Sequence, residues 1–434
     1  MDALDFNRWQ LKQRLAQLRE ETDFWRDQTR SDDTYRRHSS QVQAFASIID
    51  TLCAEIAPTA SEPVSDGADA RERSRVVLAL FRIWQFLRGK LVQRADARFR
   101  NFLWLADEYA WLCYKPIYEI GLRVPPLVFL NGGYSPFTLT RQEGFEAEYV
   151  PKELLQGKSL LEAMASLPFP VIGVPWYQIH DLTELAVIGH EVGHSVEADL
   201  KLDLPIKNAI CSQVNDLLRQ QRWNSWASEL FADLYGCMSC GAAFVSTLAG
   251  FLSTERSNTA NAGYPPPNLR FHFNLEVLRS LQDNIGAAKL EEKWKAKYAV
   301  LGEWAAFLPD APQIAAAILD GVATGGKRVR NLIPFQEDSQ YVPELIDAVQ
   351  SLNDVHPGMP LRALVAAYRL AFDELMTVNA ADTIEAVLPR LERLEDAMMD
   401  ALKPDTRAGE VECSPGQLQL LVRKSADVWI SVLR

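Results

Sequence analysis

The feature that most constrains this chain is the stretch at residues 180–200, HDLTELAVIGHEVGHSVEADL. Asp181, followed three residues later by Glu184, resembles a capping box with Asp in the place of Ser or Thr, and it predicts the start of a helix. The apolar residues that follow recur every three or four positions: Leu182, Leu185, Ile188, Val192 and Val196. The stretch therefore predicts an amphipathic helix that buries one face in a core.

Two histidines and a glutamate on this helix predict a metal site. His190 and His194 are four positions apart, so both imidazoles point the same way and can reach one ion. Glu191, next to the first histidine, can act as base on a metal-bound water. The His-Glu-x-x-His pattern also arises by chance in unrelated proteins, where the helix simply belongs to the core. Here two of only six histidines in the chain fall inside it, which favours the metal site.

Two glycines interrupt the same helical pattern. Gly189 and Gly193 each cost a helix interior about 1 kcal/mol relative to alanine. A glycine at such a position permits the close approach of another backbone, and the alternative is merely a weak helix. We therefore expect a second element to pack tightly against this helix.

A zinc enzyme of this type needs a third protein ligand. In the helical pattern SWASELFADLYGCMSCG (225–241), Glu229 and Asp233 are four positions apart and share one face. We predict that Glu229 is the third ligand and that Asp233 accepts a hydrogen bond from the far nitrogen of a ligand histidine, with His190 the expected donor. The alternative, a solvated acidic face, fits poorly because the surrounding residues are apolar.

A rival source for the third ligand lies just past the histidines. Glu197 is three residues after His194, and Asp199 follows it. Either carboxylate could reach the ion, but ligands from one continuous helix close a tetrahedral site badly. We therefore prefer Glu229.

The two patterns together resemble the gluzincin zinc metallopeptidases. The resemblance is greatest to the branch that includes HtpX and the CAAX prenyl proteases, whose second helix reads Glu-x-x-Ala-Asp, as residues 229–233 do here. It covers roughly residues 165–280. It implies a zincin-like catalytic core, one zinc ion per chain held by His190, His194 and Glu229, and peptide hydrolysis. The membrane spans of that branch are absent, so the resemblance implies a relative without them.

The same resemblance implies a later His-Pro…Arg element that stabilises the oxyanion. Tyr264 stands where the histidine is expected and Arg270 matches the arginine, and both side chains can donate to an oxyanion. A competing match supplies His356 and Arg362, which keeps the histidine but lies far beyond the third ligand. We prefer the first pair, and a proline-rich turn without a catalytic role remains the alternative for both.

The only convincing β region precedes the histidine helix, at residues 121–176. Its run FPVIGVPW (169–176) is flanked by Pro170 and Pro175, which favours an edge strand because proline cannot donate to a central ladder. An edge strand beside the zinc helix would hold an extended peptide across the metal. A buried core strand is the alternative.

Length and charge bound the remaining possibilities. The chain has 434 residues, enough for several units, and we divide it into an N-terminal helical region (1–120), a zincin-like core (121–285) and a C-terminal helical region (286–434). A net charge of −12 disfavours nucleic acid as a partner, since phosphate binding needs concentrated Lys and Arg. There is no long apolar run for a membrane span and no signal-peptide pattern at the start, so we expect a cytoplasmic protein.

These inferences predict a mainly α protein with a small β-sheet (α+β). We expect a zinc-dependent endopeptidase or oligopeptidase that acts on a peptide or protein substrate, with Glu191 as general base. Two alternatives stay open: a non-catalytic zinc-containing protein that binds and regulates a partner, and a dedicated protease with one protein substrate. The sequence does not specify the cleavage preference, the oligomeric state or whether the protein is latent.

Overall fold

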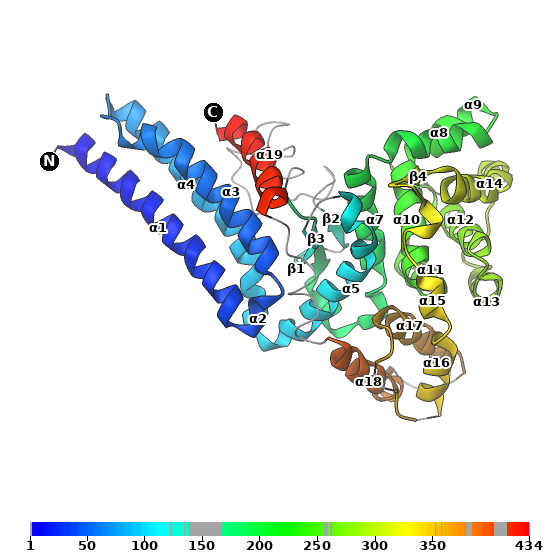
Figure 1. The fold of residues 1–434 in the computed structure, drawn as a ribbon. Helices are drawn as coiled ribbons and strands as arrows, with labels where there is room; N and C mark the ends of the chain where they lie inside the picture. Colours follow the sequence, from blue (N-terminus) through cyan, green and yellow to red (C-terminus); the bar gives the residue numbers. More distant parts are fainter. Residues whose placement is uncertain are drawn as a thin grey trace.

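The structure, a computed structural model, describes residues 2–121, 124–133, 135–138, 167–255, 259–260, 263–351, 353–356, 358–378, 384–402 and 415–433. Within these residues the chain is mainly helical, with one three-stranded sheet and one two-stranded sheet. The predicted fold class, mainly α with a small β-sheet, is confirmed. Figure 1 shows the long helices of residues 3–91 on one side of the small sheet and most of the later helices on the other.

In the N-terminal part three long helices pack side by side: α1 (Ala3–Ser31), α3 (Ser39–Ser61) and α4 (Gly67–Leu91). The short α2 (Asp33–Arg36) lies between α1 and α3 in the chain. After the 3-10 turn η1 (Val92–Ala95), the long α5 (Ala97–Gly121) packs instead on the small sheet and on the helix at residues 187–200. Asp2 and Asp66 cap the starts of α1 and α4 by accepting hydrogen bonds from backbone N–H groups of the first turn. The last helix, α19 (Pro415–Leu433), returns from the far end of the chain to pack on α3 (Figure 1).

The three-stranded sheet lies between two apolar cores. Its strands are β1 (Leu127–Asn131), β2 (Phe137–Thr138) and β3 (Val171–Pro175), in the order β1-β3-β2. Along β1, Leu127 and Phe129 join the core of α1, α3 and α4, whereas Val128 and Leu130 join the core that contains the later helices. The alternation follows the two-residue period of a strand, and it explains why both faces of the sheet are apolar.

The prediction that residues 169–176 form an exposed edge strand is wrong. β3 is the central strand, parallel to β1 on one side and antiparallel to β2 on the other, and all its residues are buried. Pro170 precedes the strand and Pro175 ends it, so neither proline has to donate within the ladder. The prolines thus mark the two ends of a short central strand.

Side chains close the outer edge of β1. The carbonyl oxygen of Val128 accepts from Arg94 Nη2 at 2.7 Å, and its N–H donates to Asp107 Oδ1 at 3.0 Å. Two residues on, Leu130 exchanges two hydrogen bonds of 2.8 Å with the amide of Gln93. Arg94 and Asp107 are fully buried and also pair with each other at 2.6 Å. This edge of the sheet therefore has its backbone groups satisfied without another strand.

The helices after β3 carry the predicted metal site. They are α7 (Val187–Leu200), α8 (Asp203–Gln213), α9 (Leu217–Ser225), α10 (Ala227–Cys240), α11 (Ala242–Phe251), α12 (Pro267–Ser280) and α13 (Asn284–Trp294), after the 3-10 turns η2 (Trp176–His180) and η3 (Leu182–Glu184). The predicted helix start at Asp181 is wrong for the α-helix itself: the Asp181 side chain accepts from the N–H of Thr183 and caps η3, and α7 begins only at Val187.

Gly193 brings α7 close to α10. A Cβ atom at Gly193 would lie 2.9 Å from both Ala232 Cα and Tyr235 Cβ, and one at Gly189 would lie 3.0 Å from Ser239 Cβ. Neighbouring backbone and Cβ atoms cannot move aside as a flexible chain end can. The close approach expected from the two glycines is confirmed.

The remaining elements enlarge the second core. They are η4 (Leu252–Thr254), η5 (Gly302–Asp310), α14 (Ala311–Ala316), η6 (Ala317–Gly321), the strands β4 (Ala323–Thr324) and β5 (Lys327–Arg328), η7 (Val329–Asn331), α15 (Phe335–Ser339), α16 (Val342–Gln350), α17 (Leu361–Val378) and α18 (Ile384–Ala401). α17 packs on both α11 and α18. Among the described residues, no helix combines the length and the apolar composition that crossing a membrane requires.

Candidate metal centre

Two packed helices bring the predicted ligands together. α7 presents His190 and His194 from successive turns, and α10 presents Glu229 toward them. All three side chains are buried. Their ligand atoms lie within 4.8 Å of one another, a geometry that can hold a metal ion.

The donor atoms converge on one place. Nε2 of His190 lies 3.1 Å from Nε2 of His194, and the two nitrogens lie 3.4 and 3.6 Å from the Glu229 carboxylate oxygens. Two imidazole nitrogens and one carboxylate oxygen form a ligand set that suits zinc and leaves a fourth position open. The residues present therefore fit the implied ion.

Asp233, the predicted partner of the first histidine, lies beside it. Its Oδ1 lies 2.8 Å from Nδ1 of His190, the nitrogen that faces away from the ligand atoms. Asp233 is fully buried and also accepts from Arg270 Nε and Nη2, both at 2.7 Å, and from Asn274 Nδ2 at 3.0 Å. Three donors thus fix the carboxylate that orients His190.

Charge explains why these buried carboxylates stay ionised. Burial alone would raise the pKa of Asp233, but Arg270 and His190 outweigh it and lower that pKa to about 2. Burial acts on Glu229 in the same sense, and the charges of His194, Arg270 and His190 hold its pKa well below the usual range. Between these two carboxylates and Arg270 one negative charge remains, which favours a cation beside the imidazoles.

The same surroundings favour a cation on His190. Burial opposes the charged ring, but contacts with Asp233 and Glu229 outweigh it and raise the pKa of His190 to about 9. Protons and a metal ion therefore compete for Nε2 of this residue at neutral pH.

The second histidine has a partner that the sequence did not suggest. Ser228, the residue before Glu229, places its Oγ 3.4 Å from Nδ1 of His194 and donates its hydroxyl hydrogen to Glu197 Oε2. The rival ligand Glu197 therefore contacts this serine, and Asp199 accepts a hydrogen bond of 2.6 Å from the Tyr114 hydroxyl. Neither belongs to the group of ligand atoms that converges on the site.

Arg270 lies at the same centre, with Tyr264 beside it. Besides Asp233, Arg270 Nη2 contacts Glu229 Oε2 at 3.1 Å, and the guanidinium carbon lies 5.4 Å from the centre of the half-buried Tyr264 ring. In the competing pair, Arg362 donates to Asp338 at 2.7 Å, and His356 is exposed. The structure thus brings Arg270 to the predicted ligand Glu229 and Tyr264 to Arg270, whereas Arg362 pairs with Asp338.

Two further residues complete the description of the site. Glu191, the predicted base, is buried on α7 and directly follows His190 in the chain. Asn274, one turn after Arg270 on α12, escaped the sequence analysis, although its spacing of four from Arg270 could have indicated it. In sequence, a polar residue on a buried helical face indicates a functional role only weakly when the side chain that it contacts is not known.

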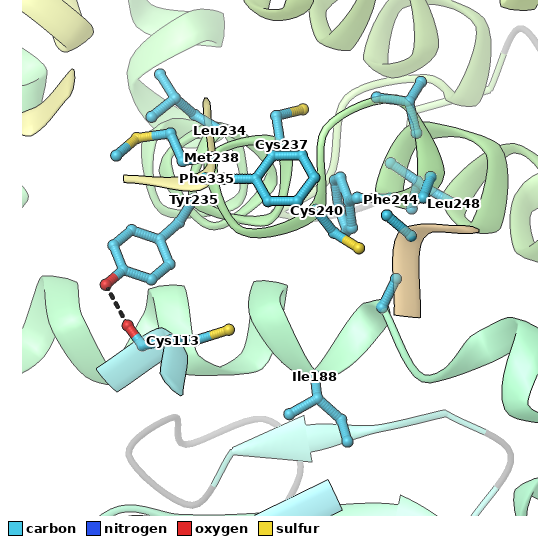
Figure 2. Close-up of a cluster of buried hydrophobic side chains, with 14 of the residues drawn as sticks. Cys113, Ile188, Leu234, Tyr235, Cys237, Met238, Cys240, Phe244, Leu248 and Phe335 are labelled. Atoms are coloured by element: carbon cyan, nitrogen blue, oxygen red, sulfur yellow. Dashed lines mark hydrogen bonds between the residues drawn. The ribbon is translucent and has the colours of Figure 1, made fainter. Parts of the chain in front are cut away.

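The Cys237-x-x-Cys240 pair belongs to the core. Both thiols are buried, and Cys237 Sγ donates to Asn274 Oδ1 at 3.3 Å. Figure 2 shows both side chains among the apolar residues between α10 and its neighbours, with Tyr235 donating to the carbonyl oxygen of Cys113 at 2.8 Å. Burial raises the pKa of Cys240 to about 12, so this thiol stays protonated at neutral pH.

Comparison of the chain with known proteins identifies no relative: no family model, no curated protein and no solved structure matches it.

Proposed function

We propose that this protein is a zinc-dependent metallopeptidase with a zincin-like core. The observation that carries the proposal is the convergence of His190, His194 and Glu229 from two packed helices, with Asp233 behind His190. These four ionisable side chains are buried between two otherwise apolar helices. Burying charged groups is costly and helix packing does not require them, so their presence here favours a functional site.

The chain supplies the groups that peptide hydrolysis needs. A bound zinc ion would polarise the scissile carbonyl and increase the acidity of the attacking water. Glu191 would act as the base that takes a proton from the attacking water and returns it to the leaving amine. Tyr264 is the preferred donor to the oxyanion, because Arg270 is already bonded to Asp233 and Glu229.

The sheet limits where an extended peptide would bind. β3 is central, and side chains close the outer edge of β1. β2 is the outermost described strand next to α7, where Thr138 Oγ1 lies 3.2 Å from Ser195 Oγ, one residue past His194. A peptide that extends the sheet along β2 would therefore run beside the histidine helix.

The decisive experiment combines metal analysis with a matched pair of variants. We expect about one zinc ion per purified chain and cleavage of members of a fluorogenic peptide library. Glu191→Gln should keep the metal and lose activity, whereas Glu292→Gln, at an exposed position, should retain both. A Glu191→Gln variant as active as the wild type would overturn the mechanism. If the protein takes up no zinc, both the proposed metal site and the proposed enzymatic activity are wrong.

A further inference from the structure

We infer that Ser228 and Glu197 are positioning residues that fix the hydrogen of the His194 ring on Nδ1 and so leave Nε2 bare for the metal. The inference rests on the proposed metal site. It assigns a function to a glutamate that would otherwise compete for the role of ligand. It also explains why a hydroxyl stands directly before Glu229 on α10.

The contacts form a short chain between the two helices. Glu197 lies one turn after His194 on α7 and is buried. Ser228 lies on α10, and its Oγ is 3.4 Å from His194 Nδ1 and bonded to Glu197 Oε2. The serine therefore bridges a buried carboxylate and the ring nitrogen that faces away from the metal ligands.

Counting hydrogens gives the direction of each bond. A carboxylate can only accept, so the single hydroxyl hydrogen of Ser228 goes to Glu197. Toward His194 the serine oxygen then offers only a lone pair, and Nδ1 must donate to it. A neutral imidazole carries one hydrogen, so Nε2 keeps a free lone pair.

His190 reaches the same state by a different route. Its Nδ1 faces the Asp233 carboxylate directly, at 2.8 Å. In its neutral ring the hydrogen therefore lies on Nδ1, and Nε2, 3.1 Å from Nε2 of His194, is then available to the metal. The two rings are held differently. The Asp233 carboxylate contacts His190 directly, whereas the Glu197 carboxylate acts on His194 through the hydroxyl of Ser228.

The tautomer can be read from the full-length protein without substrate. Nitrogen-15 NMR of the histidine-labelled, metal-free chain, at a pH where the rings are neutral, distinguishes the two ring forms. The chain has six histidines, and a His194→Gln variant identifies the signal of interest. We expect the wild-type ring in the Nδ1–H form.

Three variants separate positioning from mere structure. Ser228→Ala removes the acceptor and should shift His194 toward the Nε2–H form, with zinc affinity falling about 10- to 100-fold in a competition titration with a chelating dye. Glu197→Gln should act alike, because the new amide can donate to Ser228 and turn its hydroxyl toward Nδ1. Ser228→Thr keeps the hydroxyl and should retain the wild-type tautomer and affinity, as should Ser225→Ala at an exposed position nearby.

The failure of this inference is distinguishable from the failure of the proposed function. Wild-type His194 in the Nε2–H form would overturn it, as would a folded Ser228→Ala protein with unchanged tautomer and zinc affinity. Neither result changes the expected outcome of the Glu191→Gln activity test. Conversely, a chain that cleaves no peptide but shows the expected tautomers would lose the peptidase assignment and keep the positioning residues.

Discussion

His190 and Asp233 join the two helices of the metal site through their side chains, with His190 Nδ1 2.8 Å from Asp233 Oδ1. Arg270 and Asn274 of α12 bind the same carboxylate, so Asp233 ties three helices into one polar unit inside an apolar core. If an ion binds here, we expect this unit to set the ring plane of His190 beforehand, so that the site needs little reorganisation.

Replacing Asp233 by asparagine should weaken zinc binding. Asparagine keeps the shape but removes the charge that holds the His190 ring and Arg270, so we expect zinc affinity to fall about 10- to 100-fold. Competition with a chelating dye measures the change. Asp347→Asn, at an exposed position on α16, serves as the control and should have no effect. Unchanged zinc affinity in Asp233→Asn would show that the carboxylate does not support the metal ligand.

Arg270→Lys distinguishes positioning from oxyanion stabilisation. Lysine keeps the charge but cannot bind both oxygens of Asp233, which Arg270 holds with two hydrogen bonds of 2.7 Å. If Arg270 positions Asp233, the variant should lose about tenfold in zinc affinity. An oxyanion donor alone would instead lower kcat and leave zinc affinity intact. Titration of both proteins with zinc, beside their kinetics, decides between these outcomes.

Gly193→Ala should damage the site through packing alone. The added Cβ would lie 2.9 Å from Ala232 Cα, so α7 and α10 must separate, and the histidines would move away from Glu229. We expect a loss of about 1–3 kcal/mol in the free energy of unfolding, together with weaker zinc binding. In the control Gly89→Ala the nearest atom is a flexible Gln85 nitrogen at 3.7 Å, and stability should be unchanged or slightly higher. Equal stabilities of the two variants would contradict the close helix contact.

The sequence predicted that His190, His194 and Glu229 would converge because the signal is local. Four-residue spacings on two apolar helical patterns place His190, His194, Glu229 and Asp233 on defined faces, and helix geometry alone carries that information. The glycines predicted the tight packing of the two helices for the same reason. The α-helix start was misplaced because Asp181 caps a separate 3-10 turn, which a capping pattern cannot distinguish from an α-helix.

Other features depend on contacts between distant segments. Pro170 and Pro175 led to the wrong prediction of an edge strand, because they lie at the two ends of β3, which is only five residues long. The position of β3 in the sheet depends on its pairing with β1 and β2, which the local sequence does not reveal. Ser228 and Asn274 are ordinary polar residues in sequence. Their significance arises only when α7, α10 and α12 pack together and bring them to His194 and Asp233.

Lys90 provides a prediction outside the metal centre. Its side chain is buried, with Nζ 3.2 Å from the carbonyl oxygen of Phe86 and 3.5 and 4.3 Å from the ring centres of Phe86 and Phe129. Burial lowers its pKa to about 7 from the ordinary 10.5. Between those two pH values the unfolded chain binds more protons than the folded one, so this residue makes folding more favourable as pH rises, and its cost is greatest below pH 7.

Lys90→Met should therefore stabilise the protein in a pH-dependent way. At pH 6 the variant removes a buried charge, and after allowing for the lost attraction to the two rings we expect a gain on the order of 3 kcal/mol. The gain should shrink steadily toward pH 10, where the wild-type amine is neutral in the folded state and has begun to lose its proton in the unfolded one. Thermal unfolding midpoints of both proteins at the two pH values measure this difference.

Lys295→Met, at an exposed position, should show the same small change in stability at both pH values. A gain at Lys90 that does not vary with pH would mean that burial leaves the pKa of this amine near its ordinary value, and that the variant acts through packing instead.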